Sequence, residues 1–394
     1  MSSFTSTGPL AVIGAVPFPQ APRASEPLNN ANHEVSALPS SFPQVLKGER
    51  AWSGADFISE SAFVYELTAA DKAEIDAGLA HFKGRWSFSC LELDGSDLSS
   101  ANFPIPLLGP KLRQLSHDVH DGKGFCVVRG IDPKAYTVED LTLVYLAVQS
   151  FVADQRGCQD KRGNMLVHIV ADNSTKVRDD HHRHSTKSIS FHNEESGDVV
   201  SWLTRSTAAA GGKCIIASCY TVYNILAASR PDLVRVLARS DWPFSLPRFK
   251  CRPVIFYENS KLIMNFGRTP LLGSAIHPRP VRLPSLTPQQ VEALDAIEVI
   301  AQATQLEIQT QAGDMHFINN LAILHRREGF ADGDSAMQKR HLVRMRLRDS
   351  QLGWKIPKPL TTEWEDAFEK EDAEKVWHLE PMPDAFFPLR KYPN

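Results

Sequence analysis

The pattern that most restricts the fold of this chain is a succession of short apolar runs of strand length. Four of them span residues 124–131, 199–203, 214–218 and 253–256, and the first is bounded by glycines. No glycine-rich phosphate loop accompanies these runs. Many short strands with few helices are typical of a sandwich or a jelly roll. The sequence therefore predicts a β-rich α+β fold of this kind with flanking helices.

The C-terminal half continues the strand pattern. Residues 315–325 and 340–349 are predicted as two further strands, after an alternating stretch that includes Leu306 and Ile308. In the second strand, alternation would place Arg340, Arg344, Arg346 and Arg348 on one face. So many arginines need anionic partners if they are buried. For Arg346 and Arg348 we expect a solvated edge strand instead.

Helical periodicity occurs in four places. Residues 67–82 and 221–237 carry helix patterns, and Thr137 and Thr287 are placed to cap two more helices, the second opening with a proline. Residues 1–50 are rich in Pro, Ser, Ala and Asn without any period, which predicts a flexible or surface-hugging arm. Residues 51–394 are interpreted as a single domain.

Composition excludes several classes of partner. With 43 basic and 46 acidic residues the net charge is -3, so no basic field favours nucleic acid. No apolar stretch approaches the ~20 residues of a membrane span. The N-terminus lacks a secretory pattern and the six cysteines form no dense framework, so we expect a cytoplasmic protein. Homo-oligomer formation is left open.

The most informative motif is His192-Asn193-Glu194. In an extended segment the first and third side chains point the same way, so one imidazole and one carboxylate can reach the same metal ion. His325, which lies 133 residues after His192, is the best candidate for a third ligand. Two imidazoles and one carboxylate on one face suit non-haem Fe(II). Alone, a His-x-Glu pair is more often an accidental surface pair, so the other motifs of the sequence must decide whether this one binds a metal.

One further candidate site residue is Arg340, whose planar guanidinium suits a bidentate clamp for a ligand carboxylate. The ordered set of motifs resembles the taurine dioxygenase family of Fe(II)/2-oxoglutarate-dependent oxygenases over about residues 120–350. Residues 40–120 resemble the leader of fungal members more loosely. The motifs are His192-Asn193-Glu194, Gly211-Gly212, Gly313-Asp314, Asn319-Asn320 before His325, and the pair Arg340 and Arg344.

The resemblance implies a double-stranded β-helix, or jelly roll, with iron at the mouth of the barrel. It implies that His192, Glu194 and His325 are the iron ligands and that Arg340 holds the distal carboxylate of 2-oxoglutarate, which is used together with O2. Arg344 falls where some members bind the acidic group of their substrate. A small acidic metabolite, such as an amino acid in fungal secondary metabolism, is therefore expected to undergo hydroxylation, desaturation or ring closure.

Two departures from the family pattern stand out. The usual ligand is Asp, whereas Glu stands here as in the clavaminate synthase branch, and the adjacent Glu195 is an alternative. Cys214 occupies the place of a frequent Thr that bonds 2-oxoglutarate, and a thiol is a weak donor. Weaker cosubstrate binding would follow.

A non-catalytic jelly-roll metal-binding protein and a zinc hydrolase with the same triad remain as alternatives. The cluster His181, His182 and His184 suits a solvated loop better than a second metal site.

Overall fold

A computed structural model of the protein describes residues 37–86, 95–171, 185–274, 278–371 and 374–378. The predicted cluster at 181–184 and most of the predicted arm lie outside these residues. Residues 37–50 are described, and they pack against a helix of the domain. Leu46 is buried, and its backbone N–H and C=O both bond the side-chain amide of Asn224.

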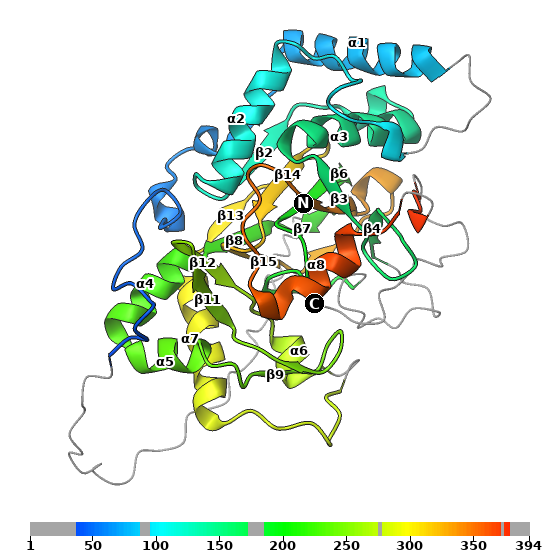
Figure 1. Ribbon diagram of the computed structural model, residues 1–394. Helices are drawn as coiled ribbons and strands as arrows, with labels where there is room; N and C mark the ends of the chain where they lie inside the picture. Colours follow the sequence, from blue (N-terminus) through cyan, green and yellow to red (C-terminus); the bar gives the residue numbers. More distant parts are fainter. Residues whose placement is uncertain (1–36, 87–94, 172–184, 275–277, 372–373, 379–394) are drawn as a thin grey trace, which may run out of the picture. The chain divides into compact units, whose positions relative to one another are not determined.

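Two sheets form the centre of the fold (Figure 1). The larger one is antiparallel except for its first pair of strands, and one further strand, β4 (Val167–Val170), pairs with β17 outside the main path. Its strands run in the order β1 (Val64–Glu66), β2 (Phe125–Arg129), β14 (Met315–Asn319), β6 (Val199–Ser206), β17 (His341–Arg348) and β3 (Gln155–Gly157).

The smaller sheet is antiparallel and carries the region around the candidate site. Its strands run in the order β13 (Leu306–Ile308), β8 (Cys214–Ser218), β15 (Ile323–Arg327) and β5 (Ile189–His192). A buried apolar layer joins the two sheets, with Val127 and Leu342 from the larger one meeting Ile216 and Ile323 from the smaller one. Two largely antiparallel sheets packed face to face confirm the predicted β-rich α+β architecture.

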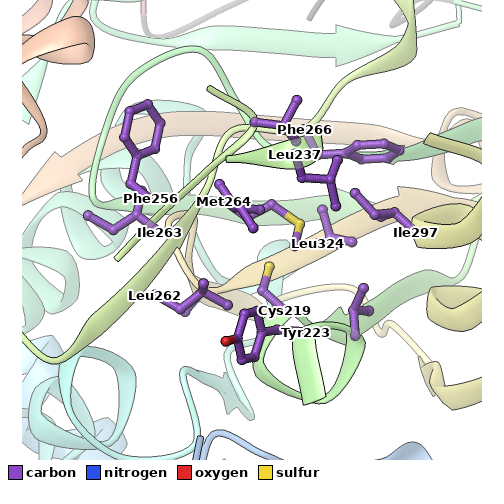
Figure 2. Packing of buried hydrophobic residues seen from close by; sticks show 14 of the residues in the cluster. Cys219, Tyr223, Leu237, Phe256, Leu262, Ile263, Met264, Phe266, Ile297 and Leu324 are labelled. Atoms are coloured by element: carbon purple, nitrogen blue, oxygen red, sulfur yellow. The ribbon is translucent and has the colours of Figure 1, made fainter. Parts of the chain in front are cut away.

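Helices cover the outer faces of both sheets. On the larger sheet, α1 (Ala69–Trp86), α2 (Leu108–His120) and α3 (Val138–Val152) form a second core with residues such as Val343 and Met345. On the smaller sheet, α4 (Cys219–Ser229), α5 (Pro231–Leu237) and α7 (Pro288–Thr304) pack with the hairpin of β11 (Ile255–Glu258) and β12 (Lys261–Met264). Figure 2 shows part of this third core, where Leu237 and Ile297 lie near Leu324 of β15 and Tyr223 lies beside Cys219.

Further short strands and two α-helices lie outside the two sheets and the helices already named. They are the strand pairs β9 (Pro243–Phe244) with β10 (Lys250–Cys251) and β7 (Ala210–Gly211) with β16 (Phe330–Ala331), and the helices α6 (Arg268–Leu272) and α8 (Thr361–Phe368).

Two predicted elements are each divided in the structure. The helix expected over 221–237 is α4 and α5, because Pro231 cannot continue a helix and opens the next one instead. The strand expected over 315–325 is β14 and β15, which belong to different sheets. Asn319 makes the turn between them, since its backbone carbonyl accepts from the N–H of Ala322 and its side chain from that of Leu321.

Candidate active site

The two histidines of the predicted triad meet because β5 and β15 are neighbours in the smaller sheet. His192 and His325 are directly paired across these strands, and their ring centroids lie 4.3 Å apart. Glu194, two residues beyond β5, brings its Oε1 to 3.9 Å from Nε2 of His192 and 3.8 Å from Nε2 of His325. One ligand atom from each residue lies within 4.8 Å of the others, so a single ion can reach all three.

The chemistry of this set fits a divalent iron. Nδ1 of His192 lies 2.9 Å from the backbone oxygen of Ser190, so it donates its proton there and leaves the Nε2 lone pair for a metal. His192 and Glu194 are buried, and His325 is nearly so. Two imidazoles and one carboxylate are the donors that suit Fe(II), and they leave coordination positions open.

Asn320 fixes the backbone that carries Glu194. Its side-chain oxygen accepts from the Glu194 N–H at 2.7 Å, and its amide nitrogen donates to the carbonyls of Glu194 at 3.1 Å and Gly197 at 3.0 Å. Asn320 is itself 1% exposed, so these bonds are sheltered from water. The loop that follows β5 is therefore anchored to the turn that precedes β15.

The two adjacent glutamates face different sides of this loop. Glu194 lines the cavity with both histidines, whereas Glu195 lines a separate small cleft with Phe244, Arg252 and others. The alternation expected of an extended segment thus continues past the end of β5. It is Glu194 that the fold brings to the histidines.

Arg340 and Cys214 line the same cavity as the triad. The guanidinium of Arg340 lies over the ring of Phe330, 5.4 Å from its centroid, and burial lowers its pKa to about 10, so it stays charged at neutral pH. Burial raises the pKa of the Cys214 thiol to about 12, which keeps it neutral. A charged guanidinium and a neutral thiol therefore line the same cavity.

Gly212 makes room for the side chain of Arg340. Its φ of +79° is a backbone conformation that residues other than glycine rarely adopt, and a Cβ there would lie 3.3 Å from Cδ of Arg340. Gly212, the second member of the glycine pair quoted from the sequence, thus packs against the side chain of Arg340.

Arg344 also lines the cavity, and it points at the triad itself. Its Nη1 donates to Oε1 of Glu194, and its Nη2 donates to the side-chain oxygen of Gln159 at 3.1 Å. Both Arg344 and Gln159 are almost fully buried. Gln159 carries no sequence motif and was missed by the sequence analysis.

Comparison with known proteins decides the family. Residues 92–346 match the family described as Taurine catabolism dioxygenase TauD, TfdA family. The chain is 34% identical to the taurine hydroxylase-like protein SAT17 of Stachybotrys chartarum, over 86% of this chain and 89% of that protein. The chain belongs to the TauD/TfdA family. This confirms the family to which the sequence motifs pointed.

More distant relatives agree with this membership. FR-33289 synthase of Streptomyces rubellomurinus is 22% identical over 80% of this chain and 94% of its own length. The solved structure of asparagine oxygenase with Fe(II), 3-hydroxyasparagine and succinate has a TM-score of 0.56 and 14% identity, covering 72% of this chain and 93% of that one. The oxygenase OrfP with iron and alpha-ketoglutaric acid gives 0.53 and 14%, with 72% and 93% coverage.

As a TauD/TfdA protein, the chain is a non-haem iron dioxygenase with a jelly-roll fold that uses Fe(II), 2-oxoglutarate and O2 on a small-molecule substrate. The enzyme class and cofactors expected from the sequence are thereby confirmed. Among the described residues of this TauD/TfdA chain, no helix is long and apolar enough to cross a membrane.

One expectation for this TauD/TfdA enzyme is wrong. Arg346 and Arg348 do not lie on a solvated edge strand, because β17 is paired on both sides, with β6 on one and with β3 and β4 on the other. Arg346 is 3% exposed and faces Glu194 and Glu195, and Arg348 lies 3.4 Å from Asp198. The predicted alternation is nevertheless present, since Leu342 faces the smaller sheet and Val343 faces the helices.

The cavity of this TauD/TfdA protein has a large aromatic wall that the sequence analysis did not identify. Trp202 of β6 lines it and stacks on His316 of β14, with ring centroids 4.7 Å apart. His316 is fully buried, and neither ring nitrogen has a hydrogen-bond partner among the described residues. Burial lowers the pKa of His316 to about 3, so the ring is neutral. Trp202 lies within the predicted strand 199–203, and its position in that strand was the sequence signal that could have identified it as part of the cavity wall.

Proposed function

We propose that His192, Glu194 and His325 hold the catalytic Fe(II). The observation that carries this proposal is the direct pairing of His192 with His325 across β5 and β15, with Glu194 Oε1 less than 4 Å from both Nε2 atoms. Bound there, Fe(II) with 2-oxoglutarate and O2 would supply the oxidising chemistry. The protein supplies the ligand geometry and a cavity walled by Trp202 and other apolar side chains.

We further propose that Arg340 clamps the distal carboxylate of 2-oxoglutarate, with Cys214 beside it. Both line the cavity of the triad, and the buried guanidinium can form two parallel hydrogen bonds to a carboxylate. The thiol of Cys214 adds less to binding than a hydroxyl would, because sulfur is a weak donor. A rather weak affinity for 2-oxoglutarate is the expected result.

We propose that the substrate is a small metabolite with a carboxylate, such as an amino acid, and that Arg344 binds this group. Arg344 lines the cavity next to the triad, and a guanidinium has the planar geometry that binds a carboxylate through two parallel hydrogen bonds. Two structural neighbours were solved with hydroxylated amino acids, 3-hydroxyasparagine and (3S)-hydroxy-L-Arg. FR-33289 synthase, by its name, synthesises the compound FR-33289, which supports a role in secondary metabolism.

The ligand set is tested by single substitutions. His192→Ala, Glu194→Ala and His325→Ala should each abolish Fe(II) binding and turnover, because two remaining ligands hold a divalent ion poorly. Glu195→Ala is the matched control and should keep substantial activity, since its side chain lines the other cleft. Reversed results for the two glutamates would contradict the assignment of Glu194. Activity that persists with zinc and without O2 would indicate a hydrolase.

The substrate is found by a succinate-release screen. The enzyme with Fe(II), 2-oxoglutarate and O2 would be offered amino acids, sulfonates and small carboxylic acids, and succinate formed above the background would be measured. A response confined to compounds with an acidic group supports the role of Arg344. A response to neutral metabolites alone would contradict it.

A further inference from the structure

Arg346 lies between the two adjacent glutamates of the site. Its Nη2 is 3.9 Å from Oε2 of Glu194 and 3.6 Å from Oε2 of Glu195, while Nη1 donates to the hydroxyl of Ser196 at 2.9 Å. The Arg346 side chain is 3% exposed, and its Nε and Nη2 have no hydrogen-bond partner among the described residues. A buried guanidinium with such donors is costly unless nearby anions compensate its charge.

The loop that carries the glutamates is shaped around Arg346. Gly197 has a φ of +101°, and a Cβ there would lie 3.2 Å from Cβ of Arg346, so a larger residue would push the loop away. Arg346 itself cannot shift easily, because its backbone is paired with Val200 on one side and Gly157 on the other. The position of the guanidinium is therefore set by the sheet, and the loop closes over it.

Two neighbouring carboxylates at a buried site repel one another. Oε1 of Glu194 faces the histidines, so its Oε2 is the oxygen directed to Arg346. Glu195 approaches the same guanidinium from the cleft on the other side of the loop. The guanidinium of Arg346 thus attracts both carboxylates and offsets their mutual repulsion, while Glu194 stays on the histidine side of the loop and Glu195 on the cleft side.

We infer that Arg346 is a positioning residue that holds Glu194 toward the histidines and retains Glu195 on the far side of the loop, so that a single carboxylate serves the metal. This inference rests on the proposed role of Glu194 as a ligand. Arg346 does not touch the reacting groups itself. Its effect passes through the two carboxylates, which distinguishes it from a residue that only stabilises the core.

The test is a double-mutant cycle read by metal binding, without turnover. Mn(II) affinity is measured from the electron paramagnetic resonance signal of the free ion, and Co(II) absorption reports the ligand geometry. Arg346→Met should weaken Mn(II) binding by about tenfold or more, the usual effect of losing a residue that orients a ligand. Glu195→Gln alone should have an Mn(II) affinity within about twofold of the wild type, because the carboxylate of Glu195 faces the other cleft.

The double variant decides the inference. If Arg346 offsets the repulsion by Glu195, then Glu195→Gln combined with Arg346→Met should bind Mn(II) within about threefold of the wild type and restore its Co(II) spectrum. A double variant as weak as Arg346→Met alone would overturn the inference, since a purely structural arginine would be insensitive to residue 195.

Two further measurements keep the outcomes distinct. Should Arg346→Met fail to fold, Arg346→Lys retains the charge without the fork, and its smaller loss should likewise be corrected by Glu195→Gln. An Arg346→Lys defect that is indifferent to residue 195 would overturn the inference. Failure of the proposed function has another signature, namely a wild-type protein whose Mn(II) binding is absent or is unchanged by His192→Ala.

Discussion

The guanidinium of Arg344 donates to Oε1 of Glu194, the same carboxylate oxygen that lies nearest to Nε2 of His192 and of His325. Arg344 comes from β17 of the larger sheet, whereas the histidines belong to the smaller one. The residue proposed to bind the substrate and the residue proposed to bind iron are therefore directly bonded. Occupation of either site should affect the other through this carboxylate.

Arg344→Ala should lower the free energy of unfolding by about 1–3 kcal/mol in the presence of a chelator, because it removes a buried partner of Glu194. A dication can replace the lost positive charge, so saturating Mn(II) should recover at least about half of this deficit. Thermal unfolding with EDTA and with Mn(II) measures both values. Arg348→Ala, whose partner is Asp198, is the control and should show the same deficit in both conditions. A metal-independent deficit for Arg344→Ala would argue against the coupling.

Arg344→Ala should also uncouple the reaction. With the substrate identified by the succinate screen, 2-oxoglutarate would still be slowly converted to succinate while product formation collapses, because the substrate is no longer oriented. The KM for 2-oxoglutarate should change little. The ratio of product to succinate measures the effect. Ordinary coupling in a folded Arg344→Ala enzyme would remove the acidic-substrate proposal.

Arg340→Lys should reduce the affinity for 2-oxoglutarate by about ten- to a hundredfold, or ~1.5–3 kcal/mol, because lysine keeps the charge but loses the bidentate fork. Titration of the anaerobic Fe(II) protein with 2-oxoglutarate measures it, and Fe(II) binding itself should persist. Arg326→Lys is a matched control, since Arg326 lines the same cavity but bonds Gln305. If Arg340→Ala left the affinity unchanged, Arg340 would have no role in binding 2-oxoglutarate.

Gly212→Ala should weaken 2-oxoglutarate binding without loss of Mn(II) binding. The new methyl group would press on Cδ of Arg340, and the positive φ adds about 1 kcal/mol or more of backbone strain. Gly48→Ala separates the two causes, because Gly48 has a φ of +103° but open space around its Cβ position. Both variants should lose thermal stability, and Gly212→Ala alone should lose cosubstrate affinity. Equal affinities in the two variants would contradict the steric argument.

His316 should make the protein sensitive to acid. Burial lowers the pKa of folded His316 to about 3 from its ordinary value of 6.5, so below pH 6.5 the unfolded chain binds a proton that the folded protein does not bind. The stability due to neutral His316 is complete above the unfolded pKa and is lost as the pH falls toward 3, by about 2 kcal/mol at pH 5. His316→Phe keeps a ring against Trp202 but has no group to titrate. Between pH 7 and 5 its free energy of unfolding, measured with urea, should therefore fall by about 2 kcal/mol less than that of the wild type. Equal losses in both proteins would show that His316 does not titrate as expected.

Much of the candidate site could be predicted from local sequence. The alternation of side chains in an extended segment identified His192 and Glu194 as a pair, and the same rule placed Arg340 and Arg344 on one face. Caps also carry local information, since Thr287 and Pro288 mark the start of α7 as expected. These features depend on the chain only a few residues away, so no knowledge of the tertiary structure is needed.

Other features were decided only when the sheets assembled. Strand pairing brings His325 beside His192 across 133 residues, and it buries Arg346 because β17 has neighbours on both sides. No local pattern distinguishes an edge strand from a central one, or shows that the run 315–325 divides between two sheets. The sequence by itself therefore determined which residues are the main candidates for the chemistry. The tertiary structure alone decided which of these residues contact one another, because contacts between distant segments depend on strand order, which local periodicity does not encode.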